Sequence, residues 1–458
     1  MASSLTAALI LTFLLTLAEG QQRYDYKQAL NLSLLFFEAQ RAGHLPADNR
    51  VPWRGDSCTQ DRGDNGEDLT GGYFTQGTTA TFIFPNAAAT TLLAWGLLDF
   101  EDAYLSADLR IRVREAIQWG ADHLVKCHTS AEELYVFLGD PLYWGRPEDI
   151  SSPRYAAKIS HNKPGSEVAA EAAAALAASS IVLRSMRETY KHHARQLYEF
   201  AKNYRGDYQF AVPNVTGYYK SWSGDEDELI WAAIWLYRAT TERRYLNEAE
   251  QFYEQFNLKS RFPIAFSWDE KTPGVDLLLY KLTLNNKYKT VIKTFCDKVT
   301  DPAFKRTPKG LYNPGYGIAP LRYALNVAFI CLNFGEILVG IGENTINPYQ
   351  NFAVTQLNYA LGDTERSYVV GFGSVYPKYP YHVAASCNPS PATCNWEDMS
   401  KETPNPNEIL GALVGGPETG DDYSDTRHWQ DNAVAVDHNS ALQSTTAGII
   451  SIIEQGRL

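Results

Sequence analysis

A glycine- and aromatic-rich stretch from Asp68 to Pro85, DLTGGYFTQGTTATFIFP, has residue types suited to a functional site. Gly71, Gly72 and Gly77 can take positive φ and let the backbone approach another surface closely. Pro85 has a φ suited to a first helical turn, and the helix-like run NAAATTLLAWGLLDF follows it directly. Rigid scaffolds commonly present binding sites on loops of this kind. The alternative is a tight turn whose aromatic side chains only pack.

The same stretch resembles the signature of glycoside hydrolase family 9, the inverting cellulases, whose usual form is DLTGGYYDAGDxVKFGFPMA. Two aspartates of that signature bind and deprotonate the attacking water, and their positions here hold Thr75 and Thr78. The family's proton donor is the glutamate of NEVACDYN. The matching stretch here is NAVAVDHN, in which Ala433 takes the place of the glutamate. The resemblance therefore implies the frame of a family site without its catalytic carboxylates.

Inverting hydrolysis needs a carboxylic acid and a carboxylate on opposite faces of the sugar, about 6.5–9.5 Å apart. Threonine carries no charge near neutral pH, and its hydroxyl is a very weak base. Losing a general base typically lowers the rate by roughly 10²–10⁴. Asp431 is a candidate for a relocated acid, because the segment from Arg427 to Val434 is one residue shorter than in the family. The base has no equivalent replacement.

The sugar-binding residues implied by the resemblance are retained in part. Tyr73 is an aromatic of the glycine-rich stretch, and Trp144 in YWGRPEDI matches an aromatic platform. His382 remains from an HxHHR-like stretch whose arginine position holds Val383, and Arg427 matches another sugar contact. The alternatives are an ordinary hydrogen-bonded histidine at 382 and a core aromatic at 144. The ligand implied is β-1,4-glucan or an oligosaccharide.

A cluster of oxygen-bearing side chains between Ser223 and Glu228, SGDEDE, resembles the calcium loop of the family. The resemblance implies a structural calcium ion held by Ser223, Gly224, Asp227, Glu228 and Asp269. Calcium takes six to eight hard oxygen ligands, and the ion would offset the repulsion between packed carboxylates. The alternative is an acidic N-terminus for the helix that begins near residue 227, and both can hold together.

The composition is typical of a secreted protein with a large core. Of the 458 residues, 45% are hydrophobic and 13% aromatic, and the formal net charge is −12, which argues against nucleic acid as a partner. The apolar run in residues 1–20 predicts a secretory signal peptide, and no later run predicts a membrane span. We expect one domain over residues 21–458, secreted to the extracellular space as a monomer. Cys387 and Cys394 are the best local candidates for a disulfide.

Helical periodicity dominates the mature chain, strand-like alternation is scarce, and the pattern predicts an all-α domain. The expected helices cover residues 24–43, 86–105, 109–127, 166–187, 194–203, 227–240, 244–256, 274–283, 288–300, 321–335, 348–361 and 440–454. Gly43 is the expected C-cap of the first. The family resemblance, closest to insect-type members, implies that these helices form an (α/α)6 barrel.

Three functions are open at this point. The first is a secreted family-9 pseudoenzyme that keeps the barrel and binds glucan without efficient hydrolysis. The second is an active inverting endo-β-1,4-glucanase with relocated carboxylates. The third is a structural or interaction protein that binds no carbohydrate.

Overall fold

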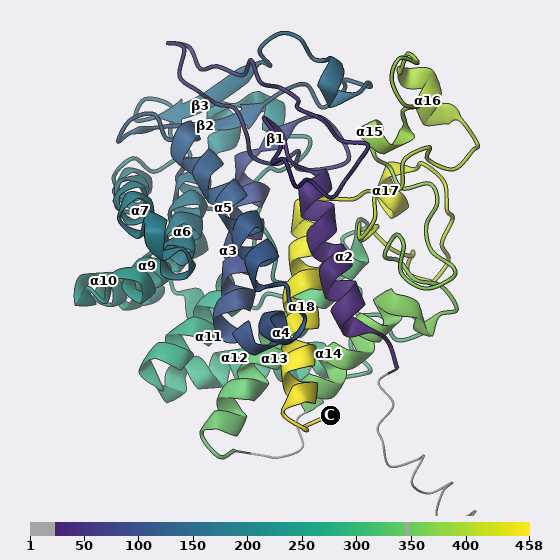
Figure 1. Cartoon of the computed structure of the whole chain (residues 1–458). Coiled ribbons are helices and arrows are strands. Elements are labelled where there is room, and N and C mark those ends of the chain that lie inside the picture. The colour runs from purple at the N-terminus through teal and green to yellow at the C-terminus, as the bar shows by residue number, and fades with distance from the viewer. Residues whose placement is uncertain (1–22, 344–347) are drawn as a thin grey trace, which may run out of the picture.

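Helices dominate the computed structural model, which describes residues 23–343 and 348–458 (Figure 1). The predicted signal peptide lies outside the described residues. The long helices are α2 (Tyr26–Ala39), α3 (Ile83–Asp99), α5 (Arg110–Cys127), α6 (Ser166–Val182), α7 (Arg187–Asn203), α9 (Glu226–Thr240), α10 (Arg243–Gln255), α11 (Thr272–Thr283), α12 (Asn286–Thr300), α13 (Pro320–Gly340), α14 (Pro348–Asn358) and α18 (Val436–Glu454). Shorter helices are α4 (Glu101–Ser106), α8 (Tyr208–Ala211), α15 (Val383–Ser386), α16 (Trp396–Ser400) and α17 (Trp429–Asn432).

Six of the described helices form a closed inner ring, in which α3 contacts α6, followed by α9, α11, α13, α18 and α3 again. Each inner helix packs against an outer partner: α5, α7, α10, α12, α14 and α2, in the same order. Figure 1 shows one such pair, α18 and α2, side by side. This is the (α/α)6 barrel that the family resemblance implied.

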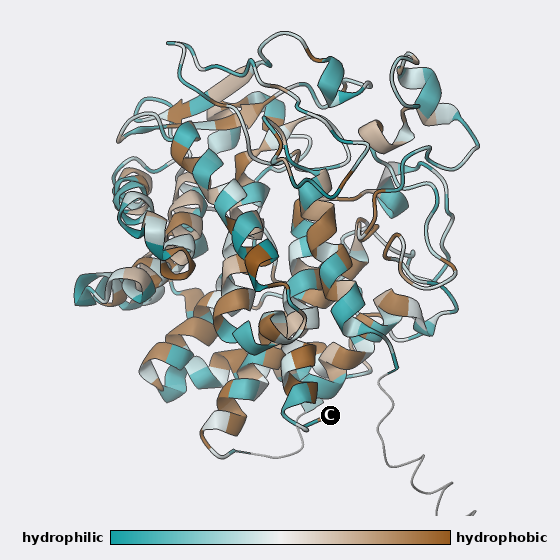
Figure 2. Ribbon diagram, in the orientation of Figure 1, coloured by the Kyte–Doolittle hydropathy of each residue, from teal (hydrophilic) through white to brown (hydrophobic). Residues whose placement is uncertain are grey.

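The residues of each helix explain its place in the two rings. Inner helix α6 reads SEVAAEAAAALAASSIV, and all of it except Ile181 is buried, because small side chains let it pack closely on both neighbours. Outer helix α10 buries only one face, formed by Tyr245, Leu246, Ala249 and Tyr253. Figure 2 shows hydrophilic (teal) and hydrophobic (brown) residues along the same helix, as a helix with one buried face requires. Among the described helices, α13 alone is long and apolar enough to cross a membrane by length and composition, and 67% of that apolar window is buried inside the barrel.

Two local features differ from the sequence-based expectations. Strands β1 (Thr81–Phe82), β2 (Glu133–Leu138) and β3 (Ala156–Ser160) form an antiparallel sheet in that order. The run ELYVFL of β2 is buried at every position but the first, so it lacks the alternation by which a half-exposed strand is found. Gly43 is not the C-cap of α2, because the helix ends at Ala39 and Gln40 caps it. Gly43 has φ +91 and passes close to the backbone of Gly71.

Candidate functional site: the cleft and the acidic loop

Three segments far apart in sequence meet at the start of α18. They are the glycine-rich stretch, the segment before α15 and the segment before α18. The Val436 amide donates to the Thr75 carbonyl at 2.9 Å, and the Val383 amide donates to the Gly77 carbonyl at 2.6 Å. A Cβ at Gly77 would lie 1.9 Å from the carbonyl oxygen of Tyr381, so this close approach requires glycine. The sequence-predicted positions of the site are thereby brought together.

Thr75 and Thr78 turn their hydroxyls into the protein. Thr75 is fully buried, and its Oγ1 accepts a hydrogen bond from the Phe82 amide at 2.7 Å and donates to Asn86 Oδ1 at 2.8 Å. Thr78 Oγ1 accepts from the Ala80 amide at 3.2 Å. Both hydroxyls therefore bind local structure, and neither can supply a charge to a ligand.

A cleft of about 600 Å³ opens beside Ala433. Its floor consists of Gln76, Ala433, Ala435 and His438, and we call these four residues the cleft floor. Its walls carry six aromatic side chains: Tyr218, Tyr219, Trp222, Trp268, Tyr316 and Tyr323. Trp222 is 77% exposed, and the Nζ of Lys220 lies 4.7 Å from the centre of one of its rings. Flat apolar faces with a few polar groups suit a sugar chain better than a charged ligand.

The carboxylates of the cleft stand on one wall. Asp269 and Glu270 are the acidic residues that line it within the described ranges, and they are neighbours in sequence. Burial raises the pKa of Asp269 to about 6 and, together with the charge of Asp227, raises the pKa of Glu270 to about 8. Asp431 does not line the cleft, and its carboxylate lies 3.9 Å from His428 Nδ1. Among the described residues, no Asp or Glu other than this adjacent pair lines the cleft.

Two of the residues predicted to bind sugar are engaged inside the protein. Tyr73 is 1% exposed, and its hydroxyl donates to the Ala116 carbonyl at 2.7 Å. Arg427 is 7% exposed, and its guanidinium donates to Asn405 Oδ1 and to backbone carbonyls of the segment after α16. Both side chains hold loops in place and offer no free surface to a ligand.

Trp144 and His382 match the alternatives considered from the sequence, which were a core aromatic at 144 and an ordinary hydrogen-bonded histidine at 382. Trp144 is 5% exposed, with its ring centre 4.9 Å from that of Trp396 and 5.3 Å from that of Tyr381. His382 caps α15, because its Nδ1 accepts from the Ala385 amide at 3.0 Å. Burial lowers the pKa of His382 to about 3, so the ring is neutral.

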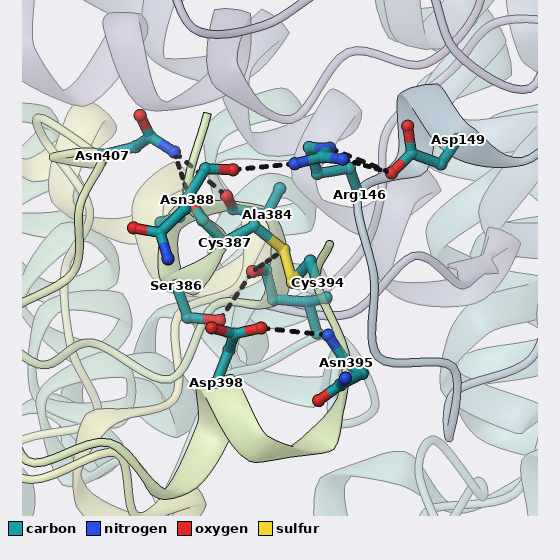
Figure 3. Close-up of a disulfide and its surroundings, with 12 residues drawn as sticks. Arg146, Asp149, Ala384, Ser386, Cys387, Asn388, Cys394, Asn395, Asp398 and Asn407 are labelled. Atoms are coloured by element: carbon teal, nitrogen blue, oxygen red, sulfur yellow. Dashed lines mark hydrogen bonds and ion pairs between the residues drawn. A yellow bond between two sulfur atoms is a disulfide. The ribbon is translucent and has the colours of Figure 1, made fainter. Parts of the chain in front are cut away.

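The loop that precedes α16, the helix that begins at Trp396, is closed by the predicted disulfide between Cys387 and Cys394 (Figure 3). Arg146 Nη1 donates to the Asn388 carbonyl at 2.8 Å, and Asn407 Nδ2 donates to the Cys387 carbonyl at 2.9 Å. A second disulfide, Cys296 to Cys331, joins α12 to α13. The loop that precedes α16 is therefore tied to its surroundings by covalent and polar contacts.

Next to the cleft, residues 223–228 and Asp269 form what we call the acidic loop. Glu228 is fully buried and neither of its carboxylate oxygens has a hydrogen-bond donor, although it forms an ion pair with Lys271, whose Nζ lies 3.8 Å from Glu228 Oε1. Burial raises the pKa of Glu228, and the charges of Asp227 and Asp269 raise it further. Asp227 accepts from the Lys271 amide at 2.7 Å and from Arg261 Nη1 at 3.0 Å. Buried acids this close, with two oxygens left without donors, fit a bound cation.

Few side chains of the acidic loop are placed to bind the same calcium ion. No three His, Cys, Asp or Glu side chains are placed around a common metal position in the part of the chain that the structure describes. An ion here would also need oxygen from Ser223, from the Gly224 carbonyl, or from water. Glu226, Asp227 and Glu228 also form the first turn of α9, so the same acids favour the start of a helix.

Several cleft residues were missed from the sequence, although two of them stand in the quoted motifs. Gln76 lies between Thr75 and Thr78, and Trp222 directly precedes Ser223. His438 stands in NAVAVDHN where the family form has tyrosine. For Gln76 and His438 the available signal was their departure from the family form, whereas Trp222 lies outside the quoted motifs.

The barrel of six helix pairs, with an aromatic-lined cleft, is the architecture that the family resemblance implies. The chain belongs to glycosyl hydrolase family 9, whose profile matches residues 26–446. Endoglucanase 15 of Arabidopsis thaliana is 36% identical over 93% of this chain and 94% of that protein. The endoglucanase of the termite Nasutitermes takasagoensis superimposes with a TM-score of 0.89 at 45% identity, covering 94% of this chain and all of that one. Endoglucanase CelQ from Clostridium thermocellum, solved with cellotriose, has a TM-score of 0.82 and 31% identity over 93% of this chain and 71% of that chain.

Proposed function

We propose that this protein is a family-9 pseudoenzyme that binds β-1,4-glucan or its oligosaccharides in the cleft without efficient hydrolysis. The observation that carries the proposal is the distribution of acids. Asp269 and Glu270 share one wall, and Ala433 stands where the family resemblance implies the proton donor. A sugar in this cleft has no acid and base on opposite faces within the described residues, as inversion requires.

The aromatic walls support retained binding. Six tyrosine and tryptophan side chains line the cleft, and Trp222 presents most of its surface to solvent. An exposed tryptophan beside a cleft suits stacking on a pyranose ring, whose faces are apolar and whose edge carries hydroxyls. CelQ, which is similar to this chain, has been solved with cellotriose and with cellotetraose.

The two other functions fit the site less well. An active endoglucanase would need Asp431 in the cleft, and its carboxylate lies outside the lining. A protein without carbohydrate binding would leave Trp222, which is 77% exposed and lines the cleft, without a ligand to cover it. Both remain outcomes of the experiment below.

We also propose that the acidic loop holds a structural calcium ion and that the protein is secreted as a monomer. Ser223, Gly224, Asp227, Glu228 and Asp269 would hold the ion, whose charge would compensate the buried carboxylates. The support is the pair of Glu228 oxygens that lack donors. Titration calorimetry of calcium into chelator-treated protein tests the ion, and a silent titration would contradict it.

The function is tested by paired assays on the purified mature protein. Incubation with carboxymethylcellulose should release reducing ends at less than about a hundredth of a typical hydrolase kcat near 10 s⁻¹. Calorimetric titration with cellohexaose should give a saturable signal. Turnover near the typical value would identify an active enzyme. If neither turnover nor binding is detected, the remaining function is that of a structural or interaction protein.

A further inference from the structure

Two segments of the chain match the acceptor pattern for N-linked oligosaccharides, which is Asn-x-Ser/Thr with x other than proline. They are residues 31–33, which read NLS, and residues 214–216, which read NVT. A chain secreted as proposed above enters the compartment that holds the enzyme recognising this pattern. A folded protein can carry the bulky product only where the asparagine stands clear of its neighbours, so the two segments can be told apart by their surroundings.

The segment at residues 31–33 lies within α2, and its side chains are engaged. Asn31 is half-buried, and its Oδ1 accepts a hydrogen bond from Arg50 Nη1 at 2.9 Å. Ser33 is fully buried, and its hydroxyl donates to the Leu30 carbonyl at 2.7 Å. An oligosaccharide on Asn31 would crowd the Arg50 side chain and disturb this contact.

The segment at residues 214–216 has the opposite geometry. It overlaps a 3₁₀ turn in which Val215 is fully buried, while Asn214 and Thr216 are exposed. The Thr216 amide donates to the Pro213 carbonyl at 3.1 Å, so the turn is fixed by its backbone as well as by the buried valine. Among the described residues, the Asn214 side chain has no hydrogen-bond or ionic partner. Its amide can therefore carry a substituent without the loss of a contact.

This turn stands at the edge of the cleft. Residues 216–219 line the cleft, whereas Asn214 is not one of its lining residues. The Cα atoms of Asn214 and Thr216 are at most about 7 Å apart, because only two peptide units separate them. A branched oligosaccharide is larger than this separation. Attached to Asn214, it would occupy space in front of the cleft without replacing any lining side chain.

We propose that Asn214 is N-glycosylated, whereas Asn31 is not, and that the oligosaccharide at the cleft rim obstructs the approach of solid cellulose. The assignment rests on the proposed secretion and glucan binding. The co-reactant is a lipid-linked diphospho-oligosaccharide. Asn214 Nδ2 forms a bond to the anomeric carbon of the first sugar and gives up one proton, while the bond from that carbon to the diphosphate oxygen breaks. The lipid diphosphate leaves with the bonding electron pair.

The modification is tested with the full chain, expressed with its own leader in cultured insect cells. Protein from the medium is compared before and after treatment with a peptide N-glycosidase. The wild type and the matched control Asn31→Gln should migrate faster in a denaturing gel after treatment. Asn214→Gln should migrate at the treated position from the start and should not respond. Peptide mass spectrometry of the treated wild type should find aspartate at position 214 and asparagine at position 31, because the enzyme converts an occupied asparagine to aspartate.

The results separate this assignment from the proposals on which it rests. Secreted protein with an unmodified Asn214, or with an occupied Asn31, would overturn the assignment and leave secretion standing. Absence of the protein from the medium would overturn secretion and this assignment together.

The effect at the rim is measured by adsorption to microcrystalline cellulose. The wild type should adsorb less before treatment than after it, and untreated Asn214→Gln should adsorb as the treated wild type does. Equal adsorption of the treated and untreated wild type would overturn the obstruction and leave the modification standing. If neither form adsorbs, glucan binding is overturned, and the obstruction with it.

Discussion

The cleft floor and the acidic loop lie against the same cleft but differ in the charges they carry. The floor presents two alanines, a glutamine and a neutral histidine, whereas the loop concentrates buried carboxylates. Catalytic carboxylates are costly to keep in a buried site, because their desolvation and mutual repulsion destabilise the fold. Carboxylates that hold a structural cation contribute to stability instead. On our proposal, the loss of catalysis and the retention of the loop have the same cause, which is the energetic cost of buried carboxylates that hold no cation.

The strongest test of this contrast introduces carboxylates at the three positions where the family resemblance implies them. The triple variant Thr75→Asp, Thr78→Asp and Ala433→Glu should raise hydrolysis of carboxymethylcellulose by about 10²–10⁴-fold over the wild type, measured as reducing ends. It should also lower Tm, because a carboxylate at position 75 would face Asn86 Oδ1 in the interior. The double variant without Ala433→Glu is the control and should remain far below the triple one. A folded but inactive triple variant would show that the cleft has changed beyond its side chains.

The acidic loop is tested by removing one charge and the metal. In calcium at about 100 times its Kd, binding adds about 2.7 kcal/mol to stability, so EDTA should lower the Tm of the wild type by several degrees. Glu228→Gln should remove this response in differential scanning calorimetry. Glu226→Gln, two residues earlier and with its Oε2 2.5 Å from Arg261 Nη2, should keep it. An EDTA-insensitive wild type would contradict the calcium proposal.

Lowering the pH should destabilise the protein through its buried histidines. His382 has a pKa of about 3 in the folded protein against an ordinary value near 6.5, so only the unfolded chain gains a proton as pH falls below 6.5. This residue should therefore remove about 2 kcal/mol of stability between pH 7 and pH 5. His382→Asn keeps an N-cap without a titrating ring, and its Tm should fall less over this range. His44→Asn, at an exposed histidine, should follow the wild type.

The smallest expected effect separates the exposed tryptophan from the covered one. Trp222→Ala should weaken cellohexaose binding about fivefold, if the stacking is worth about 1 kcal/mol, the range of an aromatic pair. Trp144→Ala should lower Tm and leave affinity unchanged, because Trp396 and Tyr381 already cover the ring. Fluorescence titration measures both. Equal affinity loss in the two variants would return Trp144 to the sugar-binding surface.

The fold was largely predictable from the sequence because helical periodicity is local. The predicted helix at 109–127 matches α5 (Arg110–Cys127), and that at 227–240 matches α9 (Glu226–Thr240) within one residue. The hairpin of β2 and β3 was missed, since its buried strand shows no alternation. Closure of the helices into a ring came from the family resemblance, because periodicity carries no information on which helices touch.

The site was predictable in position but not in orientation. The family motifs located Thr75 and Ala433, and the backbone does bring their segments together. Which way a side chain turns depends on partners far along the chain: the Tyr73 hydroxyl reaches the Ala116 carbonyl, and His382 lies 2.9 Å from Gln40 Oε1, 342 residues away. Such long-range contacts cannot be recognised from the local sequence.

The position of α18 in the sequence determines when the barrel can close during synthesis. This helix closes the ring between α13 and α3, and its first turn carries part of the cleft floor, yet it follows all the other described helices in sequence. Until residues 436–454 have been made, the apolar inner faces of α3 and α13 stay exposed to water. A copy truncated before them would lose barrel closure and ligand cleft together, and would be treated by a cell as misfolded rather than as a weak binder.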